Sequence, residues 1–382
     1  MTTIASVSLD VLEVPLRAPL ETGAARWTGR RLGLVRITGA GGEQGLGEVA
    51  LEGHGDAAIA VPGDAAAALV GLDPSDLAAL EIRLGRLDGL PGIGRALRSA
   101  VETAAADLAA RSAGVPLAVA MAGRCRPSIA VNGLIGIVDP DTAASLAARL
   151  ATEGYACLKL KVGDEGPDAL AARLGAVRAT VGPGMLLRVD ANGAWPDVAR
   201  AASSLHALAP FGLEYAEQPL PAALGPGALA RLRETSDVPI AADESVTGMQ
   251  AARALLEAGA VDVLVVKPAR VGGVRQALRI AALAAGAGVP VVVSTLLETG
   301  IGLAAALHVA AALPGATDGE RAHGLATGEV LVSDLLAEPL AIAGGRLAVP
   351  SGAGLGVVVD AAAVSRYRVA PAAVAIERHL AP

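Results

Sequence analysis

Short apolar runs alternate with amphipathic segments rich in Ala, Leu and Arg from Ser128 onward. The runs have the length of strands, and they recur about every 25 to 30 residues, the repeat of a β/α unit. They cover 129–134, 156–161, 186–190, 213–217, 239–243, 262–267, 290–295 and, more weakly, 323–326. Eight such units predict a β/α barrel. An open doubly wound sheet is the competing arrangement, although it rarely has eight units.

The residues before this repeat follow another pattern, which predicts a small α+β domain. Its expected elements are a hairpin of 32–37 and 46–50 around the Gly-rich segment 38–45, a helix over 75–84 capped by Asp73-Pro74, and a helix over 94–112 that ends at Gly114. After about residue 345 the repeat gives way to strands and loops with Gly and Pro. We expect three parts: a domain over 1–125, the barrel over 126–344, and a segment over 345–382 that packs back on the first domain.

Composition excludes several classes of protein. Of the 382 residues, 53% are hydrophobic and only 2% aromatic, so the core must depend on close packing of Ala, Leu and Val. The net charge is −7 without a basic cluster, which argues against a nucleic-acid partner. Gly, Pro or His interrupts the most apolar stretches, so no membrane span is expected. The N-terminus lacks a basic leader, and two cysteines suit a reducing compartment, so we expect a cytoplasmic protein.

Ionisable residues stand at the ends of five successive predicted strands. They are Lys159 and Lys161, then Asp190 followed by Asn192, then Glu217, then Asp243 with Glu244, and finally Lys267. The carboxyl ends of barrel strands form the mouth in which active sites lie. An unpaired charge would be costly to bury there, so five in succession indicate chemistry rather than packing.

The order of the strands assigns roles to these residues. In an eight-stranded ring the second and sixth strands are opposite, so Lys161 and Lys267 face each other, with Asp190, Glu217 and Asp243 on the arc between them. Three adjacent carboxylates repel one another unless a cation joins them, and an all-oxygen set suits Mg²⁺. Such an ion can hold a substrate carboxylate and stabilise the enediolate that forms when the α-proton leaves. Lys161 would be the base, and Lys159, on the same strand face, favours its neutral form.

These ordered motifs resemble the enolase superfamily, and within it the muconate lactonizing enzyme subgroup. The matching segments are CLKLKVG at 157–163, LRVDANGAW at 187–195, EYAEQPL at 214–220, IAADES at 240–245 and VLVVKPARVGG at 263–273. The resemblance extends over nearly the whole chain. It implies an α/β fold, a TIM-like (β/α)7β barrel with an N-terminal α+β capping domain that the C-terminal segment completes.

The resemblance also implies a role for each site residue. Mg²⁺, or Mn²⁺ in its place, would be the cofactor, held by Asp190, Glu217 and Asp243. Lys161 would be the acid/base on one face and Lys267 the cationic or acid/base partner on the other, with Lys159 tuning Lys161. Asn192 would support the metal site, and Glu244 would lie behind the ligands.

Members of the subgroup catalyse several reactions with this metal and lysine pair. The segments at 128–136, 296–314 and 323–335 resemble o-succinylbenzoate synthases most, which implies a carbon–oxygen lyase of menaquinone synthesis. Muconate-type cycloisomerase and N-acylamino acid racemase are the isomerase alternatives. Dipeptide epimerase is disfavoured because 323–328 lacks an Asp-x-Asp pair, and a mandelate-type racemase because Lys267 replaces a His. A metal-binding barrel without catalysis is the alternative of another class.

Substrate contacts are expected from two regions. Ser294, Thr295, Leu296 and Glu298 lie at the end of the seventh strand, before a helix whose N-terminal amides could bind a second carboxylate. From the first domain we expect His54, and a lid over 20–31 with Trp27 and Arg30. His323 is a further pocket candidate, whereas His308 is expected to be a packed helix residue. The expected partner is a small carboxylate substrate, and apolar helix faces favour a homo-oligomer.

Overall fold

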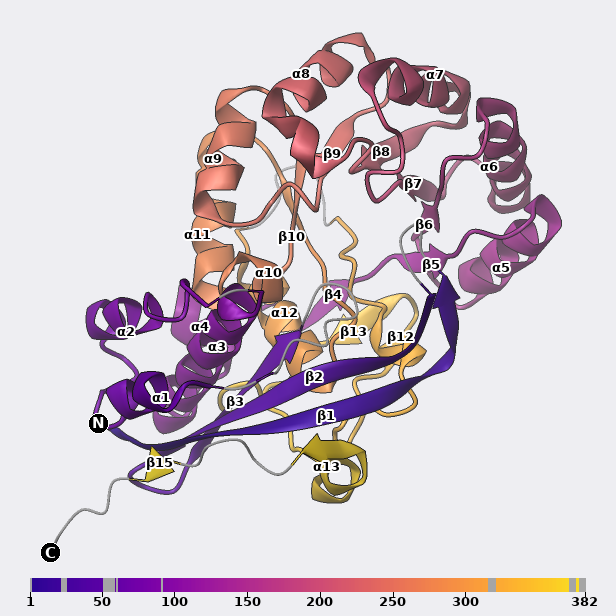
Figure 1. The fold of residues 1–382 in the computed structure, drawn as a ribbon. Coiled ribbons are helices and arrows are strands. Elements are labelled where there is room, and N and C mark those ends of the chain that lie inside the picture. Colours follow the sequence, from indigo (N-terminus) through magenta and orange to yellow (C-terminus); the bar gives the residue numbers. More distant parts are fainter. Residues whose placement is uncertain are drawn as a thin grey trace, which may run out of the picture.

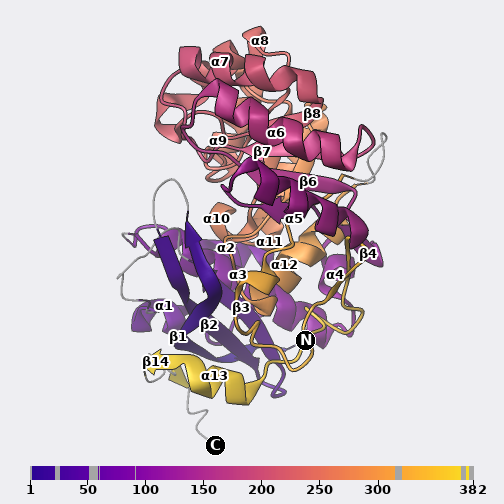
Figure 2. The ribbon, with the colours of Figure 1, turned by 90° about the vertical axis from the view of Figure 1, so that its right-hand side faces the viewer.

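The computed structural model describes residues 2–21, 26–50, 59, 61–90, 92–314, 321–370 and 376–377. The described chain forms a seven-stranded parallel sheet, a five-stranded antiparallel sheet and a three-stranded sheet. Figures 1 and 2 show the parallel strands with their helices at one end of the molecule and the antiparallel sheet with its helices at the other. Within these residues, no helix is long and apolar enough to cross a bilayer.

The parallel sheet is curled into a barrel, and the predicted barrel is therefore confirmed over the open doubly wound sheet. Its strands are, in spatial order, β5 (Gly133–Ile135), β6 (Cys157–Lys161), β7 (Leu186–Asp190), β8 (Leu213–Glu217), β9 (Ile240–Ala242), β10 (Val263–Val266) and β11 (Val291–Val293). The expected eighth strand is reduced to two bridges, Val131 with His323 and Ser294 with Gly324. These bridges join the two edges of the sheet and close the ring.

Helices cover the outside of the barrel, as a β/α repeat requires. They are α5 (Pro140–Thr152), α6 (Pro167–Val181), α7 (Val198–Leu208), α8 (Gly225–Thr235), α9 (Met249–Glu257), α11 (Val274–Gly286) and α12 (Gly300–Ala312). The short helix α10 (Pro268–Val271) follows β10 and packs against α3 (Gly94–Ser112), and short 3-10 turns lie at Ala209–Phe211, Ala222–Leu224 and Gly328–Val330. Asp139 and Asp197 cap α5 and α7 by accepting from backbone N–H groups. Helix α12 is buried on nearly all sides and packs against both the barrel and the first domain.

In its described residues, the first domain combines a long hairpin with four helices. Its elements are β1 (Ile4–Glu21), β2 (Arg26–Gly39), β3 (Gln44–Ala50), α1 (Gly63–Leu69), α2 (Leu77–Leu84), α3 (Gly94–Ser112) and α4 (Leu117–Ala122). The predicted bounds of α3 are confirmed, but α2 begins two residues later than expected. Its cap is Asp76, which accepts from Ala79 N at 3.0 Å, whereas Asp73 accepts from Ser75 N in the preceding turn.

Helix α3 lies directly on β3 because two glycines in that strand leave room for it. A Cβ at Gly45 would come within 2.0 Å of Ala104 O, and one at Gly47 within 1.9 Å of Ala100 O. Any larger residue would therefore push the helix off the sheet. This close approach fixes α3 between the antiparallel sheet and the barrel.

The end of the chain returns to both earlier parts. The strands β12 (Ile342–Ala343) and β13 (Arg346–Ala348) form a sheet with β4 (Ser128–Ala130). After α13 (Ala361–Tyr367), β14 (Arg368–Ala370) and β15 (Ile376–Glu377) pair with β1. The described C-terminal strands thus contact the start of the barrel and the first domain.

Asp107 in α3 connects three parts of the chain and gives a stability prediction. Its fully buried carboxylate accepts from Leu46 N at 2.9 Å, from Leu355 N at 2.6 Å and from Arg111 Nε at 3.0 Å. Asp107→Ala leaves these donors without their partner, so we expect the free energy of unfolding in urea to fall by about 2 to 4 kcal/mol. The exposed Glu338→Ala is the control and should change it by less than about 0.5 kcal/mol. An equal stability of both variants would contradict this role.

Candidate active site

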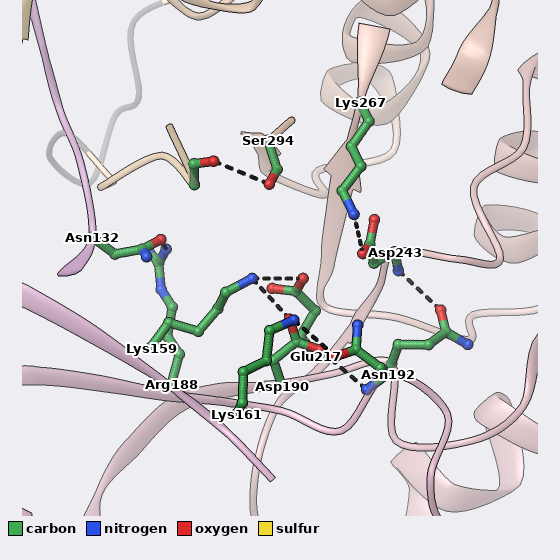
Figure 3. A network of polar contacts seen from close by, with 12 residues as sticks. Asn132, Lys159, Lys161, Arg188, Asp190, Asn192, Glu217, Asp243, Lys267 and Ser294 are labelled. Atoms are coloured by element: carbon green, nitrogen blue, oxygen red, sulfur yellow. Dashed lines mark hydrogen bonds and ion pairs between the residues drawn. The ribbon is translucent and has the colours of Figure 1, made fainter. Parts of the chain in front are cut away.

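The ionisable strand-end residues meet at the mouth of the barrel (Figure 3). Lys161, Asp190 and Glu217 end β6, β7 and β8 and are direct neighbours in the parallel register. Asp243 and Lys267 directly follow β9 and β10. The three carboxylates are buried, while the Lys161 side chain is 27% exposed. The structure thus brings Lys161 and Lys267, which are 106 positions apart in the sequence, to the same site.

Two lysines bind the first pair of carboxylates. Lys159 Nζ lies 2.9 Å from Asp190 Oδ2 and 3.0 Å from Glu217 Oε1. Lys161 Nζ lies 2.7 Å from the same Asp190 oxygen and 2.8 Å from Asn192 Oδ1. Burial disfavours the charge on Lys159, but the facing carboxylates of Asp190 and Glu217 outweigh it and raise the pKa of Lys159 well above its ordinary value. Lys159 therefore stays a cation beside Lys161.

A different set of cations binds the third carboxylate. Lys267 Nζ lies 2.7 Å from Asp243 Oδ2, and Arg270 Nη1 lies 2.5 Å from Asp243 Oδ1. Figure 3 shows Lys161 and Lys267 approaching the carboxylates from different sides. The two lysines are thus separated by the group of acids, as the order of the strands predicts.

The buried acids of the site differ in how strongly the protein disfavours their charged forms. Burial raises the pKa of Glu217 to about 7, and the carboxylates of Asp190 and Asp243 add to this effect. Burial and the neighbouring Asp243 also raise the pKa of Glu244. By contrast, Lys159 and Lys161 overcome burial and hold the pKa of Asp190 well below its usual range. Glu217 is therefore the carboxylate for which the surrounding cations compensate least.

Asp190, Glu217 and Asp243 are the residues that could hold a metal ion. They supply only oxygen donors, from neighbouring strands, in a buried setting, which is the chemistry that Mg²⁺ prefers. Glu244 Oε2, behind them, is a buried oxygen without a hydrogen-bond partner among the described residues. As they stand, the carboxylates face lysines and an arginine, and no three Asp, Glu, His or Cys side chains of the described chain are arranged to bind an ion. The donor set fits a divalent cation in composition.

Strained backbone follows two of these acids. Asn192 and Gln218, two and one residues after Asp190 and Glu217, have φ values of 45° and 40°, which are unfavourable for residues other than glycine. Asn192 Nδ2 donates to Glu244 Oε1 at 3.0 Å. Gln218 Oε1 accepts from Asp243 N at 3.0 Å, so it fixes the backbone of the next acid. The role of Gln218 was not predicted, although its place in the Glu-Gln-Pro motif was a signal for it.

The polar side chains at the end of β11 form hydrogen bonds with other residues of the protein. Ser294 Oγ donates to Gly324 O at 3.1 Å, and the hydroxyls of Thr295 and Thr327 lie 2.5 Å apart. Glu298 accepts from Leu296 N and is only 2% exposed. Burial and the nearby Glu48 raise the pKa of Glu298 to about 7. Contact of these residues with a substrate stays a prediction.

The backbone amides at the start of α12 were expected to bind a carboxylate of the substrate, but a carboxylate of the protein itself, that of Glu48, binds them. Glu48 of β3 accepts from Thr299 N at 3.0 Å, from Gly302 N at 3.1 Å and from the Thr299 hydroxyl at 2.6 Å. The amides that could have bound a substrate carboxylate are therefore occupied. Glu48 instead ties the first domain to the loop that carries Glu298.

The expected lid is largely strand. Leu20 belongs to β1 and Arg26–Arg31 to β2, and both figures of the fold show this hairpin end rising toward the barrel. Arg30 is buried, and its Nη2 donates to Leu296 O at 2.9 Å, so this part of the hairpin is tied to the loop after β11. Residues 22–25 and His54 lie outside the described residues, as does the side chain of Trp27.

Two buried arginines were missed by sequence reasoning. Arg270 shares Asp243 with Lys267, as described above. Arg188 is fully buried inside the barrel, where it donates to Glu214 Oε2 at 2.7 Å and to Ala322 O at 2.8 Å. Arg188 lies two residues before Asp190 and therefore on the same face of the strand, which indicates from sequence alone that its side chain points into the barrel.

Two of the three histidines named in the sequence analysis, His323 and His308, serve the fold. His323 is buried at the closure of the barrel, where its Nδ1 accepts from Val293 N at 2.9 Å, and burial lowers its pKa to about 3. His323 is therefore a neutral, packed side chain that helps to close the barrel, and not a residue of the substrate pocket. His308 is packed in α12, as expected, and accepts from Ala118 N at 3.3 Å.

The distribution of lysines along the chain also points to this site. The chain contains three lysines, Lys159, Lys161 and Lys267, and all of them lie in this site. The other 28 basic residues of the 31 Lys and Arg are arginines. An arginine stays charged at any ordinary pH, whereas a lysine can lose its proton in a suitable setting. The chain thus places its lysines only where a reversible proton carrier would be useful.

Family comparisons agree with this arrangement. Residues 141–363 match the family "Enolase C-terminal domain-like", and residues 6–121 match "Mandelate racemase / muconate lactonizing enzyme, N-terminal domain". The chain is 34% identical over 366 residues to an N-succinylamino acid racemase of Amycolatopsis sp, covering 93% of this chain and 94% of that one. It is 30% identical over 378 residues to muconate cycloisomerase 1 of Rhodococcus opacus, covering 96% and 98%.

A further relative matches over a shorter stretch. The o-succinylbenzoate synthase of Thermobifida fusca is 41% identical over 217 residues, and this match spans 56% of the present chain and 64% of that protein. Among solved structures, muconate lactonizing enzyme from Pseudomonas fluorescens complexed with muconolactone superposes with a TM-score of 0.85 at 29% identity, covering 96% and 99%. The L-Ala-D/L-Glu epimerase from Bacillus subtilis gives 0.82 at 27% identity, covering 94% and 99%.

Proposed function

The chain belongs to the mandelate racemase/muconate lactonizing enzyme family of the enolase superfamily, and we propose that it removes the α-proton of a carboxylate substrate in a Mg²⁺-dependent reaction. The observation that carries the proposal is the placement of Lys161 and Lys267 on different sides of Asp190, Glu217 and Asp243. Two proton carriers that flank a carboxylate cluster suit a reaction at a carbon held between them.

Asp190, Glu217 and Asp243 would hold the cation, Mg²⁺ or Mn²⁺. Once bound, it would hold the substrate carboxylate and stabilise the negative charge that develops as the α-proton leaves. The buried all-oxygen set supports this assignment, and so does the raised pKa of Glu217. Asn192 and Gln218 would hold the ligands in place from behind.

For the reaction itself, we propose dehydration to o-succinylbenzoate. Lys161 would take the α-proton at Nζ, beside the Lys159 cation. The resulting Lys161 ammonium would then protonate the departing β-hydroxyl on the same face. The carbon–hydrogen and carbon–oxygen bonds break, and water leaves. The Lys267 ammonium would stabilise the developing charge from the other side.

The identity to the Thermobifida fusca protein supports this choice among the family's reactions. In this proposal the enzyme acts in the cytoplasm, in menaquinone synthesis, and its partner is a small carboxylate molecule. N-succinylamino acid racemisation is the second candidate. The flanking lysines favour racemisation, because Lys161 could take a proton from one face of the carbon while Lys267 returns a proton to the other. The match to the Amycolatopsis protein, which covers 93% of this chain and 94% of that one, also favours it.

A substrate panel tests the proposal. Purified protein with Mg²⁺ is given the succinyl-bearing hydroxycyclohexadiene carboxylate that precedes o-succinylbenzoate, N-succinylamino acids, muconates and dipeptides, and kcat/KM is measured for each. We expect the highest value for the cyclohexadiene substrate. A higher value for N-succinylamino acids or muconates would replace the lyase by the corresponding isomerase. No turnover and no α-proton exchange with any member would favour a non-catalytic barrel.

A further inference from the structure

Helix α3 of the first domain packs against α10, the short turn that follows Lys267. The buried Ser99 Oγ donates to Pro268 O at 2.9 Å, directly after that lysine. One helical turn further, the carboxylate of Glu102 lies against Gly273, where an added Cβ would come within 2.0 Å of Oε2. Gly272 and Gly273 have φ values of 104° and 118°, so the turn requires glycine for its backbone as well. The first domain therefore holds both ends of this turn.

Glu102 also supplies the beginning of α11 with a negative charge. The residue before α11 is Gly273, which has no side chain to cap the helix. Burial raises the pKa of Glu102 above its ordinary value, although the Arg275 guanidinium and the backbone N–H groups of Arg275 and Val274, the first residues of α11, oppose this rise. Arg275 Nη1 lies 3.4 Å from Glu102 Oε1. A carboxylate at a helix N-terminus stabilises that end of the helix.

The turn between these two contacts carries the cations that bind Asp243. Arg270 N donates to Lys267 O at 2.9 Å, and Gly273 N donates to Pro268 O at 2.9 Å, so the segment is one hydrogen-bonded unit. Any shift of this unit would move Lys267 and Arg270 together. Lys161, on β6, has no link to α3 among the hydrogen bonds and ion pairs of the described residues.

We propose that Ser99 and Glu102 are positioning residues for proton transfer at Lys267. The first domain would then set the reactivity of one face of the site and leave the Lys161 face unaffected. This inference rests on the second candidate of the proposed function, racemisation, because it needs Lys267 as well as Lys161 to exchange a proton with the substrate. Glu48 offers a matched comparison, since it makes the corresponding contact with the next loop, at Thr299 and Gly302.

Hydrogen exchange at each face tests the inference. N-succinyl-L- and N-succinyl-D-amino acids are incubated separately with full-length protein and Mg²⁺ in deuterium oxide, and loss of the α-proton is followed by NMR. Lys161→Ala and Lys267→Ala first show which enantiomer depends on which lysine. We expect Glu102→Gln to slow exchange of the Lys267-dependent enantiomer about tenfold, and that of the other by less than about twofold. Ser99→Ala should also lower the ratio of the Lys267-dependent exchange rate to the Lys161-dependent exchange rate, whereas Glu48→Gln should leave this ratio unchanged.

The ratio of the two rates does not depend on how much of a variant is folded, so partial misfolding cannot imitate the result. A second readout uses the three lysines: with ¹³C-labelled lysine, Glu102→Gln should move the Cε signal of Lys267 and leave those of Lys159 and Lys161 in place. Equal slowing of both enantiomers, or unchanged Lys267 signals, would overturn the positioning role alone. Absence of exchange of either enantiomer in the parent protein would overturn it together with the proposed racemisation, whereas the dehydration is tested separately by the substrate panel.

Discussion

Replacing Lys161 by Ala is expected to lower kcat for α-proton removal by about a thousandfold, because the group that takes the proton is lost. The metal ligands keep their positions on β7, β8 and after β9, and Lys159 still binds Asp190 and Glu217. Mg²⁺ affinity, measured by calorimetry, should therefore stay within about threefold of the parent value. Turnover is followed by the absorbance of the aromatic product.

The control for this variant is Arg149→Ala, which removes an exposed cation in the last turn of α5, outside the site. Its kcat should equal that of the parent protein. Two results would contradict the assignment of Lys161. One is unchanged turnover, and the other is a parallel loss of turnover and metal affinity, which would place Lys161 in the metal site and not in proton transfer.

Glu217→Gln is expected to lower Mg²⁺ affinity by about a hundredfold or more and turnover by a similar factor. The substitution keeps the size of the side chain but removes the central charge of the three ligands, and a hard cation binds a carboxylate far better than an amide. Calorimetry with Mg²⁺, and with Mn²⁺ as a second ion, measures the affinity. Chelation of the metal in the parent protein should abolish turnover, and added Mg²⁺ should restore it.

The same variant should not lose stability when metal is absent. Burial and the neighbouring acids raise the pKa of Glu217 from 4.5 to about 7, so the folded protein disfavours its charged form. This unfavourable contribution grows as the pH rises from about 4.5 to about 7, and it is fully present above pH 7. A neutral Gln removes it, and at pH 8 the metal-free variant should be at least as resistant to urea as the parent. The exposed Glu257→Gln is the control for both measurements. Reduced stability with unchanged metal affinity would make Glu217 a structural residue.

Strand ends were the part of this protein that local pattern could predict. A buried parallel strand is mostly apolar, so an ionisable residue at its end stands out, as at Asp190 and Glu217. The alternation of side chains then places Lys159 and Lys161 on one face, and the order of strands round a ring places Lys267 on the far side. These inferences depend only on neighbours along the chain and on the regular geometry of a barrel.

Contacts between the two domains could not be predicted in this way. The expected free amides at the start of α12 are occupied by Glu48, 251 residues away, and the turn after Lys267 is held by Ser99, 169 residues before Pro268. Glu48 and Ser99 look like ordinary polar residues of a strand and a helix. Their partners follow from how the first domain packs on the barrel, which local periodicity does not specify.

The amino-acid pattern was therefore sufficient for the barrel and for the order of acids and lysines round its mouth, because both follow from regular strand geometry. Folding in three dimensions settled how the charges are shared: Lys159 bridges Asp190 and Glu217, while Lys267 and Arg270 divide Asp243. It also settled which residues from the first domain reach the loops of the site. The physical reason is that side-chain pairing depends on distances of a few ångströms between segments, and these are fixed only when the two domains pack.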